Sequence, residues 1–149
     1  MTGMNRRGLL TAGLAVTAAA VAPEVQAQDV VPVAPVTPDG FSALSPDEAL
    51  DLLIAGNEAF LRGELPPPPT GAKRRLELAK GQAPFCVYVT CSDSRVPPEI
   101  LFGRGLGELF IVRNAGNTVG TVAMGSIEYA VAELRVPLRY VKEEGTLGT

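Results

Sequence analysis

Hydrophobic positions fall into short continuous runs and longer periodic stretches along this chain. Residues 85–90 are apolar up to a final threonine and rich in β-branched and aromatic side chains, which is typical of a strand covered on both faces. Residues 109–113 form a second such run, and residues 137–142 indicate a third strand. Residues 122–134 carry apolar side chains on one side of a predicted helix. This order predicts an α/β fold with a parallel sheet and flanking helices.

Helix signals precede the first strand. Ser45 is an N-cap followed by a proline, and Glu48 completes a capping box, so a helix is predicted to begin there and to end at Gly63. The prolines at 66–69 exclude helix and favour polyproline geometry, which we interpret as a stiff spacer rather than a partner-binding segment. Residues 73–80 predict a short basic helix whose charges lie on a solvated face.

The composition fits one globular domain. The chain has 149 residues, a formal net charge of −3, 46% hydrophobic residues and 19% charged residues. This mild acidity argues against nucleic acid as a partner, because such binding requires a basic patch. Histidine, the commonest metal ligand and proton shuttle, is absent from the sequence. The two cysteines, Cys86 and Cys91, are too poorly placed along one strand for a disulfide, and Cys86 is interpreted as a buried strand residue.

The first residues have the features of a secretory signal. Arg6 and Arg7 precede an apolar run at residues 8–22, and residues 25–27 offer a small-residue cleavage site. The paired arginines indicate the twin-arginine route. Because the apolar run is shorter than the roughly 20 residues that span a bilayer, we expect residues 1–27 to be removed rather than to anchor the chain. The mature protein is then predicted to be periplasmic or secreted, without a membrane partner.

Proline-rich sequence separates this signal from the remaining domain, which covers residues 45–149. Residues 28–44 are interpreted as an extended linker or arm with little core of its own. A disordered tether and an ordered arm both fit this composition.

The chemistry of the chain is concentrated in Cys91-Ser92-Asp93-Ser94-Arg95, directly after the first predicted strand. Alternate side chains of an extended segment share a face, so a thiolate, a carboxylate and a guanidinium converge there. Zinc accepts sulfur ligands at about 2.3 Å and carboxylate oxygens at about 2.0–2.2 Å. The spacing therefore indicates a metal site at Cys91 and Asp93. A simple loop ion pair between Asp93 and Arg95 is the alternative interpretation.

A longer set of motifs resembles the β-class carbonic anhydrases. The similarity spans roughly residues 45 to 138, and it is carried by the segments 91–99 and 105–117, by Gly56-Asn57 and Phe60, and by 126–130. This resemblance implies a β-carbonic-anhydrase-like sheet, a zinc cofactor and reversible hydration of carbon dioxide to bicarbonate. It also implies a homodimer or higher oligomer, in which the N-terminal arm is an element exchanged with a partner subunit.

The resemblance also implies roles for individual residues. Cys91 is the thiolate ligand of zinc, and Asp93 either binds the metal or pairs with Arg95. Arg95 offers a permanently charged fork that holds Asp93 off the metal, which makes Asp93 and Arg95 the catalytic pair. The vacated position takes a water whose pKa falls towards about 7 and whose hydroxide attacks carbon dioxide.

The family completes its zinc site with a His and a second Cys after the next strand. Glu144 and Leu147 stand at the corresponding positions here. Glu144 carries a possible oxygen ligand, whereas Leu147 has none. We therefore expect a truncated or frame-altered member of the family, with a partial sheet whose C-terminal half is missing. Such a chain is predicted to bind zinc weakly, to be unstable and to be inactive.

Three functional hypotheses follow. The first is an exported, zinc-dependent carbonate dehydratase. The second is a catalytically dead remnant that at most associates with an intact homologue. The third is an enzyme with Cys91 as nucleophile and Arg95 lowering its pKa, which lacks a histidine base. Tight zinc occupancy separates the first hypothesis from the second.

Overall fold

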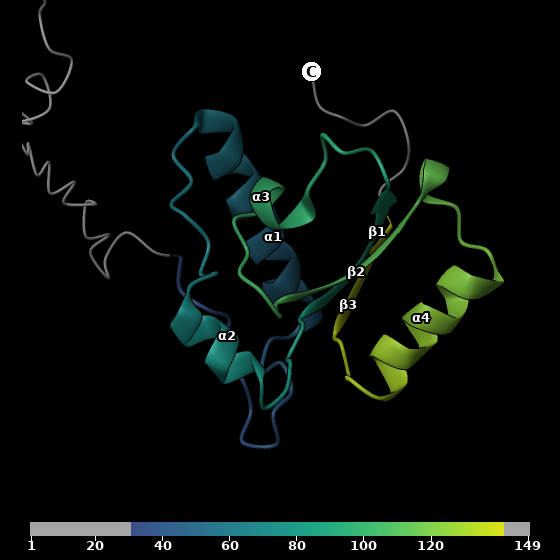
Figure 1. The fold of residues 1–149 in the computed structure, drawn as a ribbon, viewed down its shortest axis with the longest axis horizontal. Coiled ribbons are helices and arrows are strands. Elements are labelled where there is room, and N and C mark those ends of the chain that lie inside the picture. The colour runs from purple at the N-terminus through teal and green to yellow at the C-terminus, as the bar shows by residue number, and fades with distance from the viewer. Residues whose placement is uncertain (1–30, 142–149) are drawn as a thin grey trace, which may run out of the picture.

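The computed structural model describes residues 31–141 (Figure 1). The predicted signal at residues 1–27 and the positions of Glu144 and Leu147 lie outside the described residues. No helix within the described range is long and apolar enough to cross a membrane.

A small parallel sheet forms the centre of the described domain. Its strands are β1 (Cys86–Cys91), β2 (Leu109–Asn114) and β3 (Leu138–Val141), in the order β2-β1-β3. Both neighbours pair with β1 in parallel, and the register places Cys91 opposite Asn114. The α/β fold with a parallel sheet is therefore confirmed, and the three strands agree with the predicted runs to within a residue or two.

Helices cover the two faces of this sheet (Figure 1). The long helix α1 (Pro46–Arg62) lies on one face and α4 (Thr121–Ala132) on the other, while α2 (Ala72–Leu78) follows the polyproline segment. These helices match the predicted ones, although α4 begins and ends slightly earlier than expected. The short helix α3 (Pro98–Leu101) was not predicted, and a 3₁₀ turn, η3 (Ala115–Asn117), follows β2.

The ends of α1 follow directly from its sequence. The backbone N–H of Ser45 donates to Glu48 Oε2 at 2.8 Å, and the N–H of Glu48 donates back to Ser45 Oγ at 3.3 Å. This reciprocal capping box satisfies two N–H groups that the first turn leaves without partners. Gly63 ends the helix with φ of 69°, a left-handed conformation that glycine adopts without a steric penalty.

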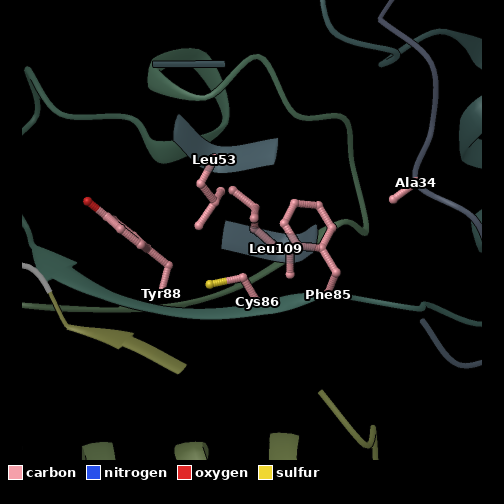
Figure 2. Close-up of a cluster of buried hydrophobic side chains, with 7 residues drawn as sticks. Ala34, Leu53, Phe85, Cys86, Tyr88 and Leu109 are labelled. Carbon is pink, nitrogen blue, oxygen red and sulfur yellow. The ribbon is translucent and has the colours of Figure 1, made fainter. Parts of the chain in front are cut away.

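The core is divided between the two faces of β1. Cys86 and Tyr88 are buried against α1, in a cluster that includes Leu53 (Figure 2). Val87 points the other way and packs with Ala130 of α4. This alternation explains why the strand reads as a continuous apolar run, because both of its faces are covered. It also places Cys91, the last residue of β1, at the carboxyl edge of the sheet.

The proline-rich arm packs against the domain from residue 31 onward. Val36 and Ser42 form an antiparallel bridge, which folds the arm back on itself. Ala34 is 8% exposed and belongs to the same hydrophobic cluster as Leu53. The described part of the arm therefore contributes to the core of its own domain, more than its composition indicates.

Candidate metal centre

The candidate site forms where β1 and β2 end together. Cys91 is half-buried at the last position of β1, and its neighbour in the register is Asn114 of β2. The N–H of Ser92 donates to the Asn114 carbonyl at 2.9 Å, so the two strand ends stay paired one residue further. Carboxyl ends of parallel strands are the usual location of ligand sites in open α/β sheets.

Asp93 and Arg95 form the bidentate pair expected from the sequence. Arg95 Nε donates to Asp93 Oδ1 at 3.0 Å and Arg95 Nη2 donates to Oδ2 at 2.6 Å, while the Arg95 backbone N–H adds a bond of 2.9 Å to Oδ1. The Asp93 side chain is 27% exposed and that of Arg95 is 84% exposed. Hydrogen bonds from the Arg95 side chain and backbone hold the pKa of Asp93 well below its usual range.

Arg113 is the residue of this site that the sequence analysis missed. It lies on β2 opposite Thr90, and its guanidinium reaches over the end of β1. Its Nε donates to the Cys91 carbonyl at 3.0 Å and its Nη2 donates to the Asp93 carbonyl at 2.5 Å. The one signal in the sequence was a charge at the end of an otherwise apolar strand.

A hollow of about 360 Å³ adjoins the site between β2 and α4. Arg113 and Asn114 line it on the polar side, and apolar side chains of both elements line the rest, among them Phe110, Val112 and Val122. The turn after β2 is fixed by Asn114 Nδ2, which donates to the Thr118 carbonyl at 2.7 Å.

The described residues supply an incomplete set of metal ligands. Within residues 31–141, no group of three or more His, Cys, Asp or Glu side chains is placed to hold a metal ion. Cys91 and Asp93 have the ligand types that zinc accepts, but Arg95 engages both carboxylate oxygens of Asp93. Protein zinc sites need three or four ligands, so the described residues do not fit zinc by themselves.

Comparison with known proteins gives this arrangement a family. The family model for carbonic anhydrase matches residues 86–141, which include Cys91, Asp93, Arg95 and Arg113. A carbonic anhydrase of Mycolicibacterium smegmatis is 43% identical over 104 residues, covering 70% of this chain and 50% of the relative. The chain is a relative of the carbonic anhydrases. The predicted resemblance to carbonic anhydrases is thereby confirmed.

Two further relatives have similar coverage. Carbonic anhydrase 2 of Mycobacterium tuberculosis is also 43% identical over 104 residues, 70% of this chain and 50% of the relative. A solved structure from Sordaria macrospora, described among tetrameric beta-carbonic anhydrases, is 31% identical with a TM-score of 0.44, over 62% of this chain and 44% of that one. The chain thus spans about half the length of the curated relatives it matches.

Proposed function

We propose that this chain carries the first part of a zinc lyase site for the reversible hydration of carbon dioxide. The Asp93–Arg95 pair carries this proposal, because it follows Cys91 directly in the segment that leaves the carboxyl edge of the sheet. Family membership supports carbon dioxide and bicarbonate as the substrates and zinc as the cofactor. Within this site, Arg95 keeps the Asp93 carboxylate ionised and fixed, and the half-buried Cys91 supplies a thiol as a second possible ligand.

We further propose that the chain by itself does not catalyse this reaction. The supporting observations are the incomplete ligand set within residues 31–141 and the absence of histidine from the sequence. Two ligands do not match the affinity of the three or four that zinc enzymes use.

Zinc stoichiometry and carbon dioxide hydration test both statements. The purified chain is dialysed, its zinc is measured by elemental analysis, and hydration is followed by stopped flow with a pH indicator. No retained zinc and a hydration rate equal to that of buffer would support the inactive chain. About one zinc per chain, with hydration that Cys91→Ser abolishes, would show instead that the chain is an active enzyme. Zinc that survives Cys91→Ser would contradict the proposed site.

Association with an intact homologue is a second candidate function. Its supporting observation is an exposed apolar surface on and just before α4, where Val122 is 87% exposed and Val119, Met124 and Tyr129 are also exposed. Large exposed apolar patches commonly mark interfaces between proteins. Co-expression with a full-length carbonic anhydrase, followed by affinity purification and native mass spectrometry, tests it, with Val122→Asp as the variant that should abolish the mixed oligomer. Recovery of the chain only as a monomer would exclude this function.

Export by the twin-arginine route remains a proposal supported by Arg6, Arg7 and the apolar run after them. With Arg6 and Arg7 replaced by lysine, the full chain should stay in the cytoplasm of a bacterial host, whereas the unchanged chain should reach the periplasm. Equal distribution of the two forms on fractionation would contradict the route.

A further inference from the structure

We infer that Arg113 is a positioning residue, which fixes the spacing of Cys91 and Asp93 by holding their backbone carbonyls. The inference rests on the proposed function only in treating Cys91 and Asp93 as ligands. The hydrogen bonds that Arg113 donates to these residues go to their backbone carbonyl oxygens, so Arg113 acts on the two side chains through the backbone that carries them.

The two hydrogen bonds of Arg113 form a bridge between the carbonyls of Cys91 and Asp93. The two carbonyls flank Ser92, and one planar guanidinium contacts both, so the distance between residues 91 and 93 is set by the fork of Arg113. Ser92 is tied to the same strand end through the Asn114 carbonyl. The last residue of β1 and the two residues after it are thus hydrogen-bonded to the last two residues of β2.

The same bridge supports the Asp93–Arg95 pair. The Asp93 carbonyl that accepts from Arg113 also accepts the N–H of Val96 at 3.1 Å, so it anchors the turn in which Arg95 lies. The Arg95 backbone N–H then meets Asp93 Oδ1 within this turn. Arg113 therefore holds the backbone on which both the thiol and the carboxylate–guanidinium pair are presented.

Arg74 provides a matched comparison within the chain. Its Nε and Nη2 also donate to backbone carbonyl oxygen, but both bonds go to the single carbonyl of Leu106, remote in sequence from Cys91. Removing Arg74 deletes two guanidinium–carbonyl bonds, together with an ion pair to Glu77, and we expect the site to be unaffected. Any effect specific to Arg113 then reflects the bridge and not the general loss of such bonds.

Amide hydrogen exchange, measured residue by residue by NMR on the full chain, tests the Arg113 bridge without any metal. Arg113→Ala should speed exchange at Arg95 and Val96 by about tenfold or more, because charge-assisted hydrogen bonds are among the stronger ones. Exchange at Val89, in the middle of β1, should change much less. Arg113→Lys should restore protection only in part, since an ammonium group does not span two carbonyls as a fork does. Arg74→Ala should leave Arg95 and Val96 unchanged.

Cadmium binding, followed by thiolate-to-metal absorption, tests whether the Arg113 bridge affects metal binding at the proposed ligands. Arg113→Ala should weaken cadmium binding by about 10–100-fold, as is typical when a group that orients a metal ligand is removed. Arg74→Ala should not weaken it, and Cys91→Ser should abolish the signal. If the unmodified chain binds no cadmium through Cys91, the proposed metal site is wrong. The exchange experiment still shows whether Arg113 positions the backbone of Cys91 and Asp93. Equal acceleration at Val89 and Val96, or none at Val96, would overturn the inference.

Discussion

Asp93 is the residue whose charge state the surrounding structure controls most directly. Arg95 donates three hydrogen bonds to its carboxylate, which lowers the pKa of Asp93, whereas the pKa of Arg95 is raised by the same contacts. A depressed folded-state pKa means that the pair stabilises the fold above the unfolded pKa of about 3.9, and that this contribution is lost as the pH falls through the folded pKa.

We predict that Arg95→Ala raises the pKa of Asp93 towards the unperturbed value of about 3.9, because the side-chain hydrogen bonds to the charged form are gone. A carboxyl-carbon NMR titration of Asp93 measures the shift. Arg62→Ala, which removes an exposed guanidinium paired with Glu64, is the control and should leave Asp93 unchanged. An Asp93 titration that is the same with and without Arg95 would refute the assigned cause.

The two cysteines should differ sharply in reactivity. Burial raises the pKa of Cys86 to about 12, partly offset by a backbone hydrogen bond at Tyr140, whereas Cys91 is half-buried at the strand end. We predict that iodoacetamide at pH 8 modifies Cys91 in the native chain and leaves Cys86 intact, as mass spectrometry of the digested protein would show. Cys91→Ser should then leave no rapidly reacting thiol.

The raised pKa of Cys86 also determines how the stability of the chain changes with pH. The thiol stays protonated in the folded chain, so its contribution is complete below the unfolded pKa of about 8.5 and is lost as the pH rises towards the folded value. Urea unfolding of Cys91→Ser should accordingly show stability falling above about pH 9. Fast labelling of Cys86 without unfolding would contradict its assignment as a buried core residue.

Residue-level prediction from the sequence reached the side chains of the candidate site but not the contacts that its backbone makes. Cys91, Asp93 and Arg95 were identified from alternation after a strand and from their ligand types. Arg113 was not, because its role depends on two carbonyl oxygens that every residue possesses. The strand pairing that brings it over Cys91 is a tertiary feature that a local pattern does not encode.

At the scale of elements, the contact between α1 and α3 depends on the absence of a side chain. A Cβ at Gly56 of α1 would come within 2.1 Å of the Phe102 carbonyl oxygen just after α3. Gly125 of α4, in contrast, has open space at the corresponding position. The two helical glycines therefore offer a matched pair of substitutions.

We predict opposite effects for Gly56→Ala and Gly125→Ala. The first should destabilise the chain by about 1–3 kcal/mol, because overpacking against backbone outweighs the gain in helix propensity. The second should stabilise it by about 0.5–1 kcal/mol, since an exposed helical glycine is replaced without a clash. Urea unfolding followed by circular dichroism measures both. Equal changes of one sign would mean that α1 and α3 are not packed as closely as described.

Elements with strong local signals were predicted well from the sequence. The capping box at Ser45 and the left-handed Gly63 define α1 at both ends, and the three strands follow from apolar runs. The short helix α3 was missed because four residues after Pro97 contain no helical period, and packing against α1 decides its conformation.

At the scale of the whole molecule, a buried ion pair joins the N-terminal arm to the domain. Arg104 and Glu108 have side chains only 4% and 2% exposed, with Arg104 Nε 3.8 Å from Glu108 Oε2. Arg104 Nη2 donates to the Pro32 carbonyl at 2.9 Å, and the N–H of Ala34 donates to Glu108 Oε1 at 2.8 Å. Each charge thus holds one backbone group of the arm, and this explains why a proline-rich segment lies ordered against the core.

We predict that Glu108→Ala destabilises the chain by about 3–5 kcal/mol, because it leaves the Arg104 charge buried without a counter-ion. It should also release the arm, since the Ala34 N–H loses its acceptor. Urea unfolding measures the first effect, and limited proteolysis within residues 31–44 measures the second.

Two further variants separate the pair from its surroundings. Removing both charges together in Arg104→Met with Glu108→Leu should cost less than the sum of the single substitutions, because neither charge is then left buried alone. Arg62→Ala breaks an exposed pair and should change stability by about 0–1 kcal/mol. Glu108→Ala could instead cost no more than Arg62→Ala and leave the arm equally resistant to protease. The ion pair would then not be what holds the arm, and the burial of Ala34 in the hydrophobic cluster would have to do so alone.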